Sequence, residues 1–164
     1  MATNGISEEE GIPDGPSNFD KVLNYIREFT SAQATRTALY HEFESAVNDH
    51  ANGSISLPEI VQVIRISQEG FNEASMTIIQ QEKLLEEIGQ TTLASIIRKL
   101  QSLEEEKLKV VTKLLSKRIE ANDNTEVSFD SEVEELTARR QSIIEAVNDV
   151  MREAHEEILD INAS

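Results

Sequence analysis

The segment Asn48 to Glu59, NDHANGSISLPE, has the spacing of an EF-hand calcium loop, with Gly53 at its sixth position and Glu59 at its twelfth. The first, third and fifth positions hold Asn48, His50 and Asn52. Glu59 is therefore the only carboxylate at a ligand position, although calcium favours several oxygen ligands with negative charge. We interpret the segment as a helix end at Asn52–Gly53 followed by a Ser56/Glu59 capping box. A degenerate EF-hand is kept as the weakest functional hypothesis.

The other titratable residues form no recognisable catalytic or metal-binding pattern. The three histidines are His41, His50 and His155, which lie far apart and form no His-Glu-x-x-His pair. No phosphate-binding glycine loop or nucleophile elbow is present, and there is no cysteine. The run Glu104 to Glu106 is expected to lie on a solvated helix face. We therefore predict that the protein is not an enzyme and uses no metal or cofactor.

Lys109, Lys113 and Lys117 recur every four residues, so they form one row on a helix. This lysine row could contact phosphate or an acidic protein. It could instead pair with acidic residues of the same protein, as Glu105 and Lys109 would at i,i+4 spacing. Pairing within the protein is the favoured interpretation.

Four long segments carry apolar residues at three- and four-residue spacing, the pattern of amphipathic helices. The predicted helices run from Phe19 to Asp49, from Pro58 to Gly89, from Thr91 or Thr92 to about Glu120, and from Ser128 or Ser131 through Ile158. Ser17 or Asn18 should cap the first helix, Thr91 or Thr92 the third, and a Ser131/Glu134 capping box the fourth. Gln33 and Arg36 interrupt the first apolar stripe. Arg140 interrupts the fourth, which otherwise has the heptads of a coiled-coil seam.

These segments predict an all-α fold, an elongated antiparallel helical bundle of about four long, coiled-coil-like helices. Each helix would be about 45 Å long at a rise of ~1.5 Å per residue. Residues 1–17 are predicted to be a disordered acidic leader and residues 18–164 a single helical domain. The alternative is a pair of helical hairpins that open and lie along a partner.

The chain has 164 residues and a formal net charge of -16. Such a chain is repelled by phosphate backbones, so direct nucleic-acid binding is not expected. The lack of cysteine fits a reducing intracellular compartment, either nucleus or cytoplasm. No apolar run is long enough to span a membrane, and the acidic N-terminus is neither a secretory signal nor a transit peptide.

Two segments carry a family resemblance, residues 29–47 (FTSAQATRTALYHEFESAV) and 93–115 (LASIIRKLQSLEEEKLKVVTKLL). Its main features are Gln33, Arg36 and Tyr40, followed by the LQSLEEEKLKVVT core of residues 100–112. In these features the chain resembles the eukaryotic "required for excision" B-type DNA-repair family, over roughly residues 19–160. The resemblance implies a small helical protein associated with excision-type DNA repair, with no catalytic residues to carry over.

Two functional hypotheses therefore lead. The first is a non-enzymatic accessory or adaptor protein that binds other proteins through its helical surfaces, as a subunit of a larger complex in DNA repair. The candidate contact residues are Lys109, Lys113 and Lys117 and the fourth-helix seam residues Val147, Val150 and Ile158. The second is a structural coiled-coil subunit of a cytoskeletal or ciliary (axonemal) assembly. Nuclear recruitment after ultraviolet damage would distinguish the first from the second.

Overall fold

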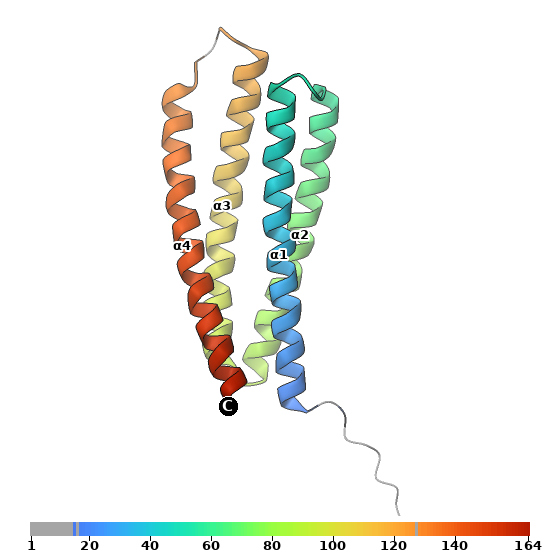
Figure 1. Cartoon of the computed structure of the whole chain (residues 1–164), viewed down its shortest axis with the longest axis vertical. Coiled ribbons are helices and arrows are strands. Elements are labelled where there is room, and N and C mark those ends of the chain that lie inside the picture. Colours follow the sequence, from blue (N-terminus) through green and yellow to red (C-terminus); the bar gives the residue numbers. More distant parts are fainter. Residues whose placement is uncertain (1–14, 16, 127) are drawn as a thin grey trace, which may run out of the picture.

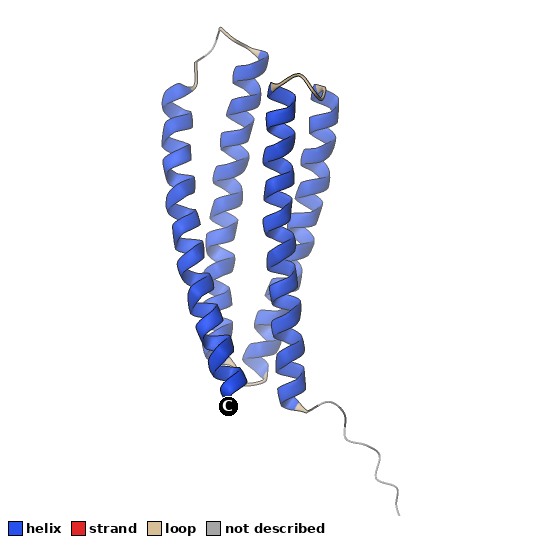
Figure 2. Ribbon diagram, in the orientation of Figure 1, coloured by secondary structure: helices blue, strands red, loops and turns tan. Residues whose placement is uncertain are grey.

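The computed structural model describes residues 15, 17–126 and 128–164 as four helices side by side (Figure 1). They are α1 (Asn18–Ala51), α2 (Leu57–Glu87), α3 (Thr91–Asp123) and α4 (Asp130–Ala163). Consecutive helices run in opposite directions, and the described part of the chain holds no strand (Figure 2). The predicted all-α antiparallel bundle is confirmed. Most of the predicted leader lies outside the described residues, so its disorder stays a prediction.

The connection from α1 to α2 forms as the sequence indicates. Asn52 caps α1, and Gly53 follows with a φ of 77°, a left-handed conformation that glycine adopts without strain. The Ser56 hydroxyl then accepts a hydrogen bond of 3.3 Å from the backbone N–H of Glu59. The same arrangement begins α1, where Ser17 accepts from the N–H of Asp20 at 3.1 Å. Both predicted serine caps are confirmed.

The predicted caps of the third and fourth helices are wrong. Gln90 precedes α3 and Phe129 precedes α4, and neither makes a side-chain cap hydrogen bond. Thr91 is already the first residue of α3, and Ser131 lies in the first turn of α4. A capping side chain must sit on the residue before the helix, in extended backbone, so these two hydroxyls are one or two positions too late.

The helices form two hairpins, α1–α2 and α3–α4, and the bundle has two hydrophobic cores that differ in the helices they combine. α1 packs most extensively on α2, and α3 on α4, whereas the backbones of α1 and α4 stay apart along most of their lengths. We call "upper" the end that carries the α1–α2 and α3–α4 connections, at the top of Figure 1. The lower core combines all four helices, for example Phe29, Ile78, Ile97 and Val147. The upper core contains residues of α1, α2 and α3, and no buried residue of α4.

The seam predicted on α4 closes the lower core. Val147 is only 6% exposed, and Val150 and Ile158 pack half-buried against the same cluster. These three candidate contact residues therefore fill the space between the hairpins instead of forming an outer surface. A contact between them and a partner stays a prediction that requires α4 to move.

Candidate functional site

The upper half of α4 lies beside α3 and leaves a groove against α1. All the buried residues of α4 come after Arg140 in the sequence, beginning at Ile143. Above that point Leu136 packs half-buried against the lower core, and the contacts nearer the end of α4 are mainly polar. Lys117 on α3 lies 3.3 Å from Glu132 and 4.5 Å from the ring centre of Phe129, and Arg140 pairs with Glu44 across the groove. Such contacts near the surface hold a helix less firmly than a shared core.

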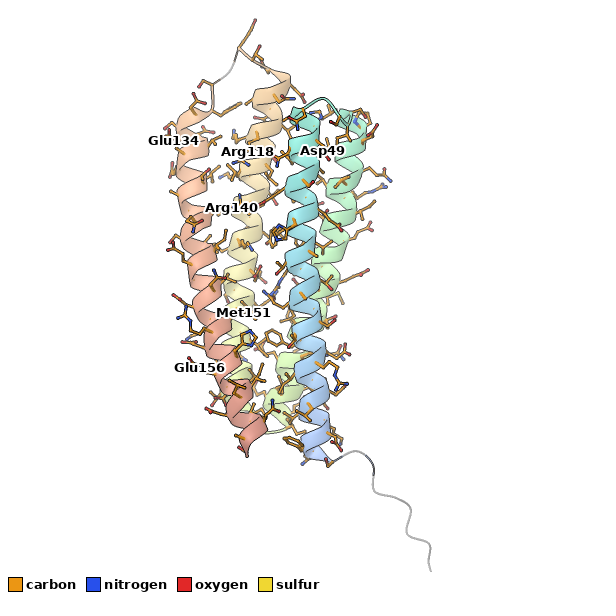
Figure 3. The ribbon with its side chains drawn as sticks, viewed as in Figure 1. Asp49, Arg118, Glu134, Arg140, Met151 and Glu156 are labelled. Atoms are coloured by element: carbon orange, nitrogen blue, oxygen red, sulfur yellow. The ribbon has the colours of Figure 1, made fainter. Side chains whose placement is uncertain are left out.

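The groove contains a cavity of about 390 Å³ at its upper end, which we call the upper hollow. Its lining comprises Val47, Asn48, His50 and Ala51 of α1, Arg118, Ile119, Ala121 and Asn122 of α3, and Phe129, Asp130 and Val133. Phe129 and Val133 are half-buried apolar side chains that belong to neither core cluster. Figure 3 places Arg118 on α3 between the upper ends of α1 and α4. The upper hollow is therefore a largely apolar depression between three helices.

His50 fixes one wall of the upper hollow. The ring is 8% exposed, with Nε2 3.1 Å from Asp123 at the end of α3 and Nδ1 3.2 Å from the carbonyl oxygen of Ile55. It thus ties the α1–α2 connection to α3. The other two histidines, His41 and His155, are exposed.

A second cavity of about 300 Å³ lies lower in the groove, on the other side of the Glu44–Arg140 ion pair. Its lining includes Tyr40, Lys107, Ile144 and Met151. Burial raises the pKa of Tyr40 strongly, and burial lowers the pKa of Lys107, whose Nζ lies 4.1 Å from the Tyr40 ring centre. The Tyr40 hydroxyl has no hydrogen-bond partner among the described residues. Its phenol therefore stays neutral.

Between α1 and α3 lies a buried polar cluster, which we define as Gln33, Arg36, Gln101 and Glu104. Arg36 is 2% exposed and Glu104 3%, and Arg36 Nε lies 3.6 Å from Glu104 Oε2. Gln33 donates to Glu104 at 3.1 Å, and Arg36 donates to Gln101 at 2.8 Å. Burial lowers the pKa of Arg36, and the charge of Glu104 opposes this effect. Each member thus depends on partners from the other helix.

The position of Glu104 corrects the prediction that residues 104–106 lie on a solvated face. Glu105 is exposed and Glu106 pairs with Arg139 at 3.2 Å, but Glu104 points into the bundle. In the sequence, Gln33 and Arg36 interrupt the apolar stripe of α1, and this interruption could have indicated a buried polar partner on another helix. Polar residues at core positions require buried partners, and Glu104 supplies one from α3.

The lysine row divides between the two interpretations. Lys117 pairs with Glu132 and Glu120, which confirms pairing within the protein for this residue. Lys109 and Lys113 are exposed and take part in none of the ion pairs of the described residues, so the predicted Glu105–Lys109 pair is absent there. The row borders a shallow groove of about 540 Å³, together with Gln68, Leu108, Thr112 and Ser116.

Within the described ranges, no three His, Asp or Glu side chains are grouped so that they could hold a metal ion. In the former calcium-loop candidate, the hydroxyl and backbone groups of Ser56 and Glu59 serve the helix cap. Across the described part of the chain, no helix is long and apolar enough to cross a bilayer.

Comparison with known proteins gives two matches. Residues 24–118, which span most of α1, all of α2 and most of α3, match the sequence model of a family described as DNA repair REX1-B. The "Heterochromatin silencing protein rss1" of Schizosaccharomyces pombe is 29% identical over 133 residues, which cover 81% of this chain and 97% of that protein. No solved structure matches. The polar cluster and the lysine row lie within the family match, and α4 lies outside it.

Proposed function

Since the chain belongs to the DNA repair REX1-B family, we propose that it is a non-enzymatic helical adaptor of DNA repair and chromatin. In this proposal it acts in the nucleus through contacts with other proteins. The name of its fission-yeast relative, a heterochromatin silencing protein, supports the nuclear setting. Neither match supports the ciliary alternative.

The upper hollow is the observation that carries this proposal. It is an apolar depression of about 390 Å³ at the point where α4 leaves the shared core. A groove between long helices can receive the apolar face of another helix, as in many helix-in-groove complexes. The half-buried side chains of Phe129 and Val133 would gain full burial when a partner covers them.

The buried polar groups support a structural rather than a catalytic role. Arg36 and Glu104 are engaged with each other and with Gln33 and Gln101. Burial of such a cluster contributes little net stability but requires α1 and α3 to pair in one register. The cluster would therefore hold the two hairpins in the arrangement that forms the groove.

The lysine row is a second candidate contact surface. Lys109 and Lys113 are the members with no ion pair among the described residues, so they are the two cations available to an acidic partner. Contact through Val147, Val150 and Ile158 would instead require the lower core to open.

A pair of matched substitutions tests the proposal. Val133→Asp places a charge in the upper hollow, and Val61→Asp places the same charge on α2, where Val61 is 56% exposed. Each variant replaces the wild-type chain in cells, and nuclear partners are recovered before and after ultraviolet irradiation. We expect cells with the wild-type chain or Val61→Asp to show the same partners and the same resistance to ultraviolet irradiation. Cells with Val133→Asp should lose both the partners and the resistance. Identical behaviour of all three chains, or recovery of the chain with axonemes, would contradict the proposal.

A further inference from the structure

We propose that the partner segment received by the upper hollow is a basic amphipathic helix. This inference rests on the proposed function and adds the chemistry of the partner. Two features of the upper end support it. α4 contributes no buried residue to the upper core, and the exposed charged residues there are mostly acidic, which also disfavours other occupants.

The expected apolar contacts with the partner follow from the residues of the upper core and of the hollow beside it. α1, α2 and α3 bury Val47, Ile60 and Val111 there, and α4 contributes no buried residue. A docked helix would cover Ile119, Phe129 and Val133, the half-buried apolar residues of the hollow, whereas Val47 is already only 3% exposed. A cavity of about 390 Å³ has room for a few apolar side chains of a helix that docks over it. The Glu44–Arg140 ion pair crosses the groove lower down, where both residues line the second cavity.

The expected polar contacts follow from the charge at the upper end. Residues 44–59 and 117–140, which extend from the upper end of the bundle to the Glu44–Arg140 ion pair, contain ten acidic residues and four lysine or arginine residues. The acidic residues are Glu44, Asp49, Glu59, Glu120, Asp123, Glu126, Asp130, Glu132, Glu134 and Glu135, and all but Glu44 are exposed. Figure 3 places Asp49 at the upper end of α1 and Glu134 at the upper end of α4, on either side of the groove. Of these ten residues, Asp130 lines the hollow together with Arg118. The others lie at the same end of the bundle and would attract lysine and arginine on the polar face of a partner.

The same charge disfavours the other occupants. A second copy of the chain would bring a further net charge of -16 to an acidic surface. The chain's own first residues carry Glu8, Glu9, Glu10 and Asp14, and α1 begins at the opposite end of the bundle (Figure 1). Nucleic acid would place phosphates against the exposed carboxylates. A basic amphipathic protein segment is the occupant that can contact the apolar lining and also be attracted by the acidic upper end.

Two synthetic 18-residue peptides test the inference with the full-length chain. Both carry leucines at i, i+3, i+4 and i+7 spacing; one has lysines on its polar face and the other has glutamates. Binding is followed by fluorescence anisotropy at 50 and 200 mM salt for the wild-type chain, Val133→Asp and Val61→Asp. We expect the lysine peptide to bind the wild-type chain and Val61→Asp equally and to bind Val133→Asp at least tenfold more weakly. We expect no binding of the glutamate peptide, and weaker lysine-peptide binding at the higher salt concentration.

The Val133→Asp variant also separates docking from general attraction. It adds a negative charge, so non-specific attraction of a basic peptide predicts binding at least as tight as that of the wild-type chain. That result, or binding of neither peptide, would overturn the inference. If both peptides bind the wild-type chain equally and both lose affinity for Val133→Asp, the basic partner is refuted while groove docking stands. Circular dichroism confirms that both variants remain helical, and a labelled DNA duplex that binds in place of the lysine peptide would refute a protein occupant.

Discussion

The most informative single perturbation is Glu104→Gln, which removes one charge from the buried polar cluster and changes its shape little. Arg36 is 2% exposed and would keep its hydrogen bonds to Gln33 and Gln101 but lose Glu104, its one ion-pair partner among the described residues. Removing one partner of a buried ion pair typically costs ~3–5 kcal/mol, because the remaining charge is left uncompensated. Because Arg36 keeps its other hydrogen bonds, we expect the free energy of unfolding to fall by about 3 kcal/mol, the smallest value in this range.

The physical cause is tested by the double variant Arg36→Met/Glu104→Gln. It removes the uncompensated charge, so we expect it to recover about 2 kcal/mol relative to Glu104→Gln alone. The free energy of unfolding is measured by urea denaturation at pH 7, with helicity as the signal. Glu105→Gln serves as the control, since Glu105 is exposed and its substitution should change stability by no more than ~0.5 kcal/mol. The reasoning is refuted if Glu104→Gln matches this control, or if the double variant is less stable than Glu104→Gln.

Three further predictions use the same denaturation measurement. Tyr40→Phe should change stability by no more than ~1 kcal/mol at pH 7, because the hydroxyl lines a cavity and makes no hydrogen bond to a described residue. The raised pKa of Tyr40 means that only the unfolded phenol ionises near pH 10, so wild-type stability should fall above that pH; an unchanged alkaline loss in Tyr40→Phe would contradict this. Ser56→Ala should cost ~1 kcal/mol through loss of the cap, while Ser131→Ala, which removes no cap, should leave stability nearly unchanged; equal losses would refute the assignment. Gly53→Ala should cost ~1 kcal/mol because φ is 77° at this position, and an increase in stability would oppose this explanation.

Apolar periodicity predicted the four helices and most of their ends, because spacing along a helix is a local property of the sequence. It also identified Gln33 and Arg36 as exceptions on the α1 face. Their partners could not be predicted, since Gln101 and Glu104 lie 65 and 71 residues further along the chain from the side chains that they contact. Only the packing of α1 on α3 brings them together.

The candidate site depended even more on tertiary structure. The heptads of α4 predicted an apolar seam, but periodicity does not indicate how far a helix stands from its neighbours. Val147 was expected on a contact surface and lies in the lower core, whereas Val133 lines the upper hollow. The separation of α4 from the upper core depends on the packing of three helices, and no local pattern reports it.

Site-specific photo-crosslinking can show whether the upper hollow binds a basic helix in the cell. A photoreactive phenylalanine analogue replaces Val133 in the upper hollow or, as a control, the exposed Val61 on α2, and the chain is irradiated in living cells. We expect abundant crosslinks from position 133 to lysine- and arginine-rich helical segments of nuclear proteins, and few from position 61. Equal crosslinking from the two positions, or crosslinks from position 133 to acidic segments, would contradict this expectation.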